Sequence, residues 1–232
     1  MKMSANPHKS DTVTIQGIRL ALDRDIMSDR MLEVLRAGRY EQAEVRQIPK
    51  ILQPGDRVVE LGAGLGFVAI AAAKLDIAES IAVYEANPRL IPLISRNQEL
   101  NGVAFDVFNQ VVLLTDELSS VPFYIRKDFW ASSLAPQPWG YSEQIEVPAI
   151  AFSEMLERHR PTMLIVDIEG GELELFRRVP LTGVKKVYIE LHQNVIGRVG
   201  MKQVFDFFSS RDFHYDQHHS TGSVVLFSHV LR

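Results

Sequence analysis

Cysteine is absent from this sequence of 232 residues. Its absence excludes a disulfide framework, a zinc site built on thiolates and a thiol nucleophile. Hydrophobic residues make up 46% of the chain, which is long enough to bury one sizeable core. We therefore expect one large α/β domain.

Long apolar runs are also missing, since none reaches the ~18–20 residues that a spanning helix needs. The stretch Met1–Thr14 is polar and lacks the apolar core of a signal peptide. The net charge is −4, and no polybasic block offers a field for nucleic acid or an anionic membrane surface. These absences predict a cytoplasmic enzyme with no nucleic acid and no membrane partner.

The chain is expected to divide at residue 52. Residues 1–14 are interpreted as a loosely packed arm, and apolar residues between Met27 and Ile51 have helical spacing. Residues 1–52 would thus form an N-terminal arm and helical segment that packs on a main domain of residues 53–232.

Strands and helices alternate in the first part of the main domain, a pattern that predicts parallel strands joined by right-handed crossovers. Helices are expected at 67–74 and from Pro88 to Asn101. Strands are expected at Arg57–Leu61, Ser80–Glu85 and Asp106–Leu114.

The middle of the chain breaks this alternation. Two expected strands, Val121–Ile125 and Gln144–Val147, flank the aromatic and proline-rich stretch Phe129–Gly140. This loop is either a substrate lid or part of a hairpin that covers a sheet edge. Trp130 and Trp139 within it either stack on an acceptor or pack against the domain.

The alternation then resumes and ends in a hairpin. Only three residues separate the last two expected strands, so they must pair antiparallel, because a parallel pair needs a much longer crossover. The expected elements are helices at Phe152–Arg158, Gly171–Arg178 and Met201–Arg211, and strands at Thr162–Asp167, Val184–Leu191, Phe213–His219 and Ser223–Phe227.

A glycine-rich turn carries the strongest chemical signal. The stretch Glu60–Gly66 has the pattern Glu-Leu-Gly-Ala-Gly-Leu-Gly between an expected strand and an expected helix. Glycines let the backbone approach a ligand, and the helix directs its free N–H groups at that ligand. Glu85 ends the next strand, where a carboxylate can accept hydrogen bonds from ribose hydroxyls. A tight structural turn and a solvated strand end are the alternatives.

The spacing also discriminates between nucleosides. The dinucleotide fingerprint is G-x-G-x-x-G with a pyrophosphate over the helix, whereas this turn reads G-x-G-x-G after Glu60. An acidic residue would repel a pyrophosphate and suits the cationic amino-acid end of S-adenosylmethionine. The charges and the C-terminal hairpin therefore favour this cofactor over NAD.

The motifs resemble those of known methyltransferases. Val58–Phe67 is similar to the first motif of class I methyltransferases, and Tyr84–Pro88 to the second. The stretch on to Arg96–Gly102, the segment Leu164–Glu172 (Leu-Ile-Val-Asp-Ile-Glu-Gly-Gly-Glu) and Ser132–Leu134 resemble the FkbM family. The resemblance covers roughly Arg39 to Phe227.

This resemblance implies a Rossmann-like class I fold. Its mostly parallel seven-stranded sheet would end in the antiparallel C-terminal hairpin, with helices on both faces, a short N-terminal helical segment and a mid-chain β insert. It also implies O-methylation of a small-molecule hydroxyl, on a sugar, polyketide or other natural product. Val166 stands where the family has Lys, which makes the transfer of substrate identity unsafe. A homodimer is left open.

The resemblance further implies which residues hold the cofactor. The glycine turn would line its methionine end, Glu85 would bind ribose, and residues after the second and third strands would flank adenine. The full set is Glu60, Gly62, Ala63, Gly64, Gly66, Glu85, Ala86, Asn87, Asn109, Gln110, Val111 and Asp167.

Four groups at adjacent strand ends are candidate catalytic residues: Asp167, Glu169, Glu190 and His192. They would form a general-base cluster or a divalent-metal site, unless some merely cap helices. Metal is not favoured, and no residue is assigned as a metal ligand. A second alternating group, His214, Asp216 and His218 with the adjacent His219, is interpreted as a solvated strand face rather than a metal site.

Three other functions stay open. A nitrogen acceptor is one, although Asp167-Ile168 stands where many N-methyltransferases have an Asn/Asp-Pro-Pro-aromatic motif. A non-catalytic nucleoside-binding protein is the second. A nicotinamide dehydrogenase is the third.

Overall fold

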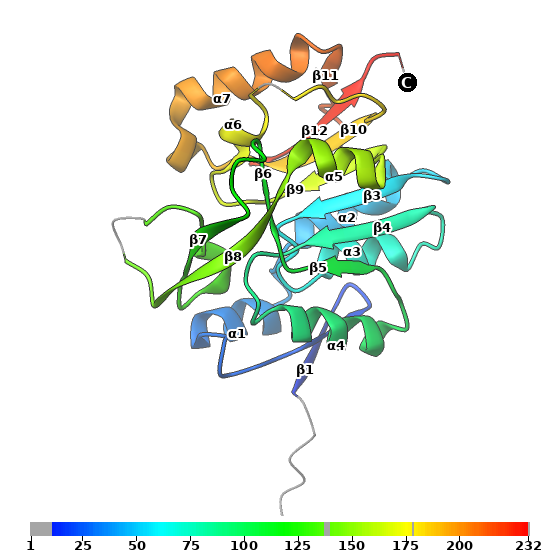
Figure 1. Cartoon of the computed structure of the whole chain (residues 1–232). Coiled ribbons are helices and arrows are strands. Elements are labelled where there is room, and N and C mark those ends of the chain that lie inside the picture. The colour runs from blue at the N-terminus through cyan, green and yellow to red at the C-terminus, as the bar shows by residue number, and fades with distance from the viewer. Residues whose placement is uncertain (1–10, 137–139, 178, 232) are drawn as a thin grey trace, which may run out of the picture.

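The computed structural model describes residues 11–136, 140–177 and 179–231. Its centre is a seven-stranded sheet in the order β11-β12-β10-β9-β3-β4-β5 (Figure 1). The strands β10, β9, β3, β4 and β5 run parallel, while β12 pairs antiparallel with β10 and β11. The bounds are β3 Arg57–Leu61, β4 Ser80–Tyr84, β5 Asp106–Phe108, β9 Met163–Val166, β10 Lys186–Glu190, β11 Phe213–Tyr215 and β12 Val224–His229.

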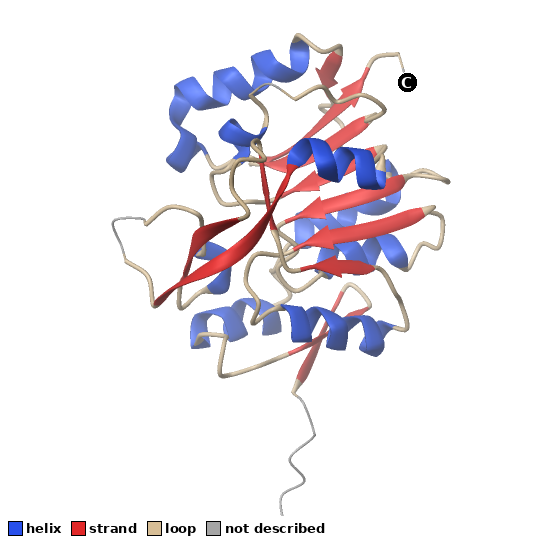
Figure 2. Ribbon diagram, viewed as in Figure 1, coloured by secondary structure: helices blue, strands red, loops and turns tan. Residues whose placement is uncertain are grey.

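Helices cover both faces of this sheet (Figure 2). On one face, alternate strand residues such as Val58 and Tyr188 pack with α1, α2, α3 and α4. On the other face, their neighbours Val59 and Val187 pack with α5, α6 and α7. The helices are α1 Asp29–Arg36, α2 Gln42–Ile51, α3 Phe67–Ala73, α4 Ile91–Asn101, α5 Phe152–His159, α6 Glu172–Leu175 and α7 Gln193–Ser209. The predicted Rossmann-like fold, a mostly parallel seven-stranded sheet with helices on both faces, is confirmed.

The N-terminal segment is more ordered than a loose arm. Residues 1–10 lie outside the described part, but β1 (Thr12–Ile15) and β2 (Ile18–Ala21) form an antiparallel hairpin that the sequence analysis missed. Asn97 of α4 accepts a hydrogen bond from the backbone of Ala21, which fastens the hairpin to the domain. The helical segment predicted before the sheet consists of two helices, α1 and α2, and the division at residue 52 remains a prediction.

The predicted third strand, Asp106–Leu114, is two strands in different sheets. β5 ends at Phe108, and β6 (Val111–Leu113) pairs with β8 (Glu143–Ala151), which also pairs with β7 (Ser120–Ile125). The side chain of Asn109 donates to the carbonyls of Glu85 and Ala86, and the chain leaves the main sheet there. β6, β7 and β8 therefore form the mid-chain insert, which projects from the C-terminal edge of the main strands (Figure 1).

Several element boundaries also differ from the prediction. α4 starts at Ile91 rather than Pro88, because an Asx turn occupies the preceding residues, where the Asn87 carboxamide accepts from the Arg89 N–H. α6 has only four residues, since Phe176 leaves the helical conformation; Arg178 lies outside the described residues. α7 starts eight residues earlier than predicted and is kinked at Gly197, whose φ is 68°.

The antiparallel C-terminal pair is confirmed, but its connection is longer than three residues. β11 ends at Tyr215, because Asp216 then accepts hydrogen bonds from His218 and His219 and turns the chain. Among the described residues, no helix combines the length and the apolarity that crossing a membrane requires.

Candidate functional site

The glycine turn joins β3 to α3 and lies in very close contact with Asp167, the residue that follows β9. Gly62, Gly64 and Gly66 all have positive φ, which an L side chain rarely adopts. A Cβ built on Gly62 would lie 1.7 Å from the backbone oxygen of Asp167. A Cβ on Gly64 would lie 2.6 Å from the hydroxyl of Tyr40. The glycine pattern is therefore required by the packing of the turn as well as by its shape.

Glu85 lies against this turn. One of its carboxylate oxygens accepts from the Gly64 N–H at 2.8 Å, and the other from the Asn87 N–H at 2.7 Å. Burial raises the pKa of Glu85 to about 7. The carboxylate keeps free lone pairs on both oxygens, as hydrogen bonding to two hydroxyls of a ribose requires.

The other predicted cofactor residues divide into two groups. Gln110 and Val111 line the same cavity as Ala86. Asn109 instead donates to backbone carbonyls, and the buried Asn87 is bound within its own turn. Residues of the second kind shape the loops rather than face the cavity; they are Ala63, Gly66, Asn87 and Asn109.

A cavity of about 340 Å³ connects these residues with the candidate catalytic group. Such a volume lies in the range of ligand sites. Glu85 and Ala86 line one end, and Asp167 and Glu169 another. The cavity is found where the parallel strands end, which is the usual ligand position in open α/β sheets.

The sequence analysis missed two residues that line the cavity, Tyr40 and Glu41. They lie between α1 and α2, and Glu41 has a left-handed backbone with φ of 41°. Tyr40 stacks on Trp130 with ring centroids 6.2 Å apart and meets Phe129 edge to face. No pattern in the sequence indicated them, because a turn between two helices has no periodicity to place it.

The loop of the insert lines the cavity from another side. Arg126, which is buried, donates to the carbonyls of Ala131 and Ala135 and to the Ser133 hydroxyl. These bonds fasten the loop in place. Trp130 packs on Tyr40 and lines the cavity, so its packing against the domain is observed and its stacking on an acceptor stays a prediction. Trp139 lies outside the described residues.

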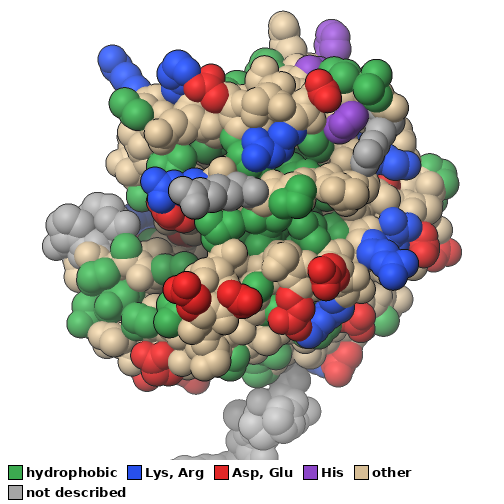
Figure 3. All heavy atoms as spheres, turned by 45° about the horizontal axis from the view of Figure 1, so that its top comes forward, with side chains coloured by type: hydrophobic (Ala, Val, Ile, Leu, Met, Phe, Trp, Pro, Cys, Tyr) green, Lys and Arg blue, Asp and Glu red, His purple; other side chains and the backbone are tan. Residues whose placement is uncertain are grey.

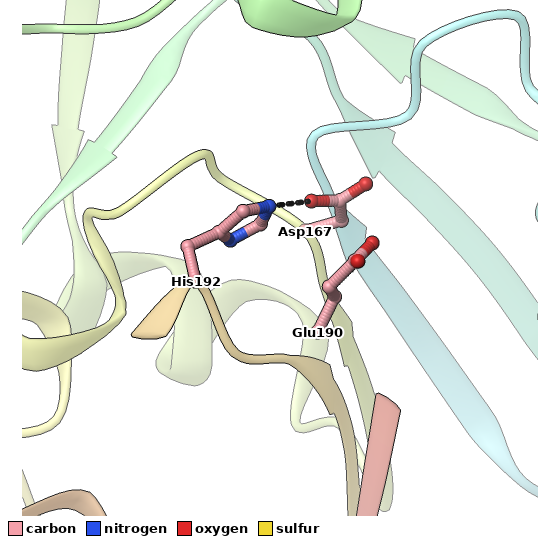
Figure 4. A group of neighbouring side chains, drawn as sticks. All are labelled: Asp167, Glu190 and His192. Atoms are coloured by element: carbon pink, nitrogen blue, oxygen red, sulfur yellow. Dashed lines mark ion pairs between the residues drawn. The ribbon is translucent and has the colours of Figure 1, made fainter. Parts of the chain in front are cut away.

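The four candidate catalytic groups meet at one place. The Nε2 atom of His192 lies 3.7 Å from Asp167 Oδ1 and 3.5 Å from Glu169 Oε2. Figure 4 shows His192 and Glu190 approaching Asp167 from the end of the neighbouring strand β10. The strand β9 ends at Val166 and Glu169 has a φ of 52°, so a turn, not a continuing strand, brings the two acidic residues together.

A fifth group, Glu172, belongs to this cluster and was not predicted as part of the site. It is fully buried, and its Oε1 atom lies 2.6 Å from His192 Nδ1. The signal that could have found it is its place in the Asp167–Glu172 segment, at the start of a short helix.

The surroundings shift the pKa values within this cluster. Burial and the neighbouring Glu190 and Glu169 raise the pKa of Asp167 well above its usual value. Burial raises the pKa of Glu169 to about 7, although His192 opposes this shift. The pKa of His192 is raised to about 9, because hydrogen bonding to Glu172 and three carboxylates outweigh its burial. This shift favours the imidazolium form of His192 at neutral pH, and its positive charge lowers the pKa values of Asp167 and Glu169 against the other causes.

A second, small cavity of about 20 Å³ lies beside the main one. Glu60, Glu190 and Tyr188 line it. Within the described part of the chain, Glu60 Oε2 and the Tyr188 hydroxyl are buried without a hydrogen-bond partner. Burial and Asp167 raise the pKa of Glu60 well above its usual value. Glu60 was predicted to line the methionine end of the cofactor; it lines this small cavity instead of the main one, and its contact with the cofactor stays a prediction.

Ligand atoms of Asp167, Glu190 and His192 lie within 4.8 Å of one another, a spacing that suits a small cation. The sequence analysis assigned no metal ligand, and that assignment stays a prediction. The other sequence candidate, around His214, forms no comparable group among the described residues. Asp216 there accepts from His219 Nδ1 at 2.8 Å and closes a turn.

Comparison with known proteins identifies the class. The sequence profile of the TRM5/TYW2 methyltransferase domain matches residues 25–118. Ribosomal protein L11 methyltransferase of Bacillus velezensis is 38% identical over 60 residues, which are 26% of this chain and 19% of that protein. The chain thus matches about a fifth of the length of such curated relatives.

Solved structures share the architecture. Trm5b from Pyrococcus abyssi aligns with 97% of this chain and 57% of its own, at a TM-score of 0.52 and 14% identity. TYW2 from P. horikoshii in complex with MeSAdo aligns with 94% of this chain and 69% of its own, at a TM-score of 0.48 and 12% identity. The match to a methyltransferase domain agrees with the predicted class, an S-adenosylmethionine-dependent methyltransferase, and with its predicted cofactor.

The predicted membership of the FkbM family is wrong, because the profile that matches is that of the TRM5/TYW2 domain. The misleading motifs have a physical origin. Gly62–Gly66 and Glu85 were predicted to bind the cofactor that class I methyltransferases share, so these motifs cannot separate one family from another. The Asp167–Glu172 segment lies outside the matched residues.

The prediction of a small-molecule acceptor with no nucleic acid is also wrong. The profile that matches is that of the TRM5/TYW2 methyltransferase domain and not that of a small-molecule methyltransferase. The net charge of −4 is a sum over the whole chain and does not give the local charge where an acceptor would bind.

Proposed function

We propose that this protein transfers the methyl group of S-adenosylmethionine to a nitrogen of a tRNA base. The observation that carries the proposal is the match of residues 25–118 to the TRM5/TYW2 methyltransferase domain. That stretch contains the glycine turn and Glu85, the residues that face the cofactor end of the main cavity.

In this proposal the cofactor lies along the C-terminal ends of β3 and β4. The ribose hydroxyls bind Glu85, the adenine lies near Ala86, Gln110 and Val111, and the methionine end reaches the turn at Gly62. The sulfonium methyl then faces Asp167. The leaving group is already activated, so the protein contributes chiefly by aligning the two reactants.

The remaining part of the cavity suits an extruded base. Phe129 and Trp130 offer aromatic faces for stacking. Asp167 Oδ1 is buried without a hydrogen-bond partner among the described residues, and such an acceptor can bind an N–H group on the edge of a base. A base is uncharged, so the carboxylates do not repel it as they would repel a phosphate.

The tRNA backbone would have to be bound elsewhere on the surface. Basic and acidic side chains are interspersed on the face drawn in Figure 3, with hydrophobic side chains gathered near its centre. Binding to this protein should consequently depend on salt less steeply than binding to a protein with a continuous basic groove.

The test is transfer of labelled methyl from S-adenosylmethionine to unmodified bulk tRNA. We expect incorporation that nuclease digestion releases as a methylated nucleoside, and loss of incorporation in Asp167→Asn. Absence of label in tRNA, with cofactor binding intact, would rule out this acceptor.

A second candidate is an amine of a protein. The observation in its favour is the carboxylate-rich cluster around Asp167, which would attract an ammonium group, together with the local identity to ribosomal protein L11 methyltransferase. Label that protease rather than nuclease releases would support this candidate instead.

A further inference from the structure

The Glu172 side chain is completely buried and contacts the candidate catalytic cluster through His192. Its side chain has no solvent-accessible surface, and its Oε1 atom accepts from the Gly170 N–H at 3.0 Å as well as contacting His192 Nδ1. A buried carboxylate with no basic residue of its own is costly unless a charged partner compensates it. Among the described residues, His192 is the partner that contacts it.

The contact determines how His192 is oriented. With Nδ1 bound to Glu172, the opposite nitrogen Nε2 points toward Asp167 and Glu169, at 3.7 and 3.5 Å. These distances exceed a normal hydrogen bond, so the imidazole lies close to both carboxylates without closing on either. The space between them adjoins the main cavity, which Asp167 and Glu169 line.

We propose that Glu172 is a positioning residue: it holds His192 as an imidazolium, which keeps Asp167 or Glu169 available to accept the proton that the acceptor loses. The inference deepens the proposed function and rests on it. The acceptor nitrogen forms a bond to the methyl carbon with its lone pair, and the carbon–sulfur bond breaks with its electrons passing to sulfur. The N–H proton goes to the carboxylate, which leaves a neutral thioether and a neutral methylated base.

Charged groups face His192 and its carboxylate neighbours from several elements. Glu172 comes from α6, Asp167 and Glu169 from the loop after β9, and Glu190 from β10. Arg126, directly after β7, lowers the pKa of Glu169, and the charge of Asp167 raises the pKa values of Tyr40, Glu41 and Glu60. One imidazolium therefore faces several acidic groups, and its charge decides whether a carboxylate there can ionise near neutral pH.

The experiment is a pH titration of the imidazole ring nitrogens by NMR on the full-length, histidine-labelled protein. His192→Gln assigns the resonance. In the unmodified protein we expect His192 to carry protons on both nitrogens at pH 7.5 and to titrate near 9. A neutral His192 at pH 7.5 would overturn the proposal without any variant.

Glu172→Gln then removes the charge and preserves the shape, since its carboxamide oxygen can accept the same two hydrogen bonds. We expect the His192 midpoint to fall by at least about one pH unit. Asp216→Asn is the matched control, because Asp216 binds His219 Nδ1 at 2.8 Å and should affect His219 alone. An unchanged His192 midpoint in Glu172→Gln would also overturn the proposal.

A kinetic measurement separates positioning from a purely structural role. In Glu172→Gln the acid limb of the kcat/KM profile should move, because Glu172 raises the pKa of Glu169, His192 lowers it, and the variant changes both charges. S-adenosylhomocysteine affinity should stay within about twofold. The NMR result does not require an acceptor, so failure of the tRNA assay leaves it interpretable, and failure of the titration leaves the proposed acceptor standing.

Discussion

Gly62 and Asp167 are packed backbone to backbone, since a Cβ on the glycine would lie 1.7 Å from the Asp167 carbonyl oxygen. The Asp167 N–H also donates to Leu61 at 2.9 Å. The cofactor turn and the proposed reacting carboxylate are therefore held at a fixed separation by main-chain contacts, which no side-chain rotamer can alter.

The first prediction concerns this contact. Gly62→Ala should destabilise the protein by about 3 kcal/mol or more, because a left-handed alanine and a backbone clash add together. Gly102→Ala is the control: it has φ of 64° but open space around its Cα, so only about 1 kcal/mol is expected. Urea unfolding measures both, and equal costs would argue against the close approach.

The second prediction concerns cofactor binding. Glu85→Gln should weaken S-adenosylhomocysteine binding about 10-fold or more, the usual effect of losing a charged hydrogen-bond acceptor. Because burial raises the pKa of Glu85 to about 7, affinity in the unmodified protein should increase as the pH rises through 7. The exposed Glu79 at the start of β4 serves as a control in Glu79→Gln. Calorimetry between pH 6 and 8 checks both statements.

The third prediction is that the ligand-free protein loses stability from pH 5 to 9. Glu85 and Glu169 have folded pKa values of about 7 against 4.5 ordinarily, so the folded state binds more protons between these values and stability falls there. His192, at about 9 against 6.5, contributes stability below 6.5 that is lost as the pH passes 9. Thermal unfolding across this range should show a falling midpoint. Glu85→Gln should flatten the lower part, and a midpoint that rises with pH would contradict the pKa shifts.

The fourth prediction is that chelation has no effect. Prolonged EDTA treatment should leave S-adenosylhomocysteine binding and methyl transfer unchanged, because a proton on His192 supplies the positive charge among Asp167 and Glu190. Loss of activity that Mn²⁺ or Zn²⁺ restores would show that this group binds a metal.

Local sequence patterns located the glycine turn and Glu85 at the cavity. The turn at Gly62–Gly66 needs glycine at each left-handed position, and Glu85 follows a buried strand in the next β-α-β unit, so both features are visible in one stretch of chain. Asp167 was found for the same reason, since it comes directly after the buried strand β9.

Contacts between distant segments were beyond the reach of these patterns. Tyr40 reaches Gly64 from a turn between two helices, and nothing in residues 36–42 indicates which way it faces. Asp106–Leu114 has the composition of one strand, and only the bonds from Asn109 to the preceding loop reveal that it divides between two sheets. The prediction of the FkbM family was wrong for a different reason. Motifs for a cofactor that many families share carry no information on the acceptor.

The hydroxyl of Ser28 donates to Asp128, so the residue that caps α1 also fastens the insert, and Tyr40 meets Trp130 a short distance away. This hydrogen bond therefore joins the start of α1 to the loop of the insert, two segments that are a hundred residues apart in the chain. Exchange of the insert for that of another methyltransferase would leave Ser28 and Tyr40 without their counterparts. Grafting of acceptor specificity onto this scaffold should succeed only when both segments are transplanted as a pair.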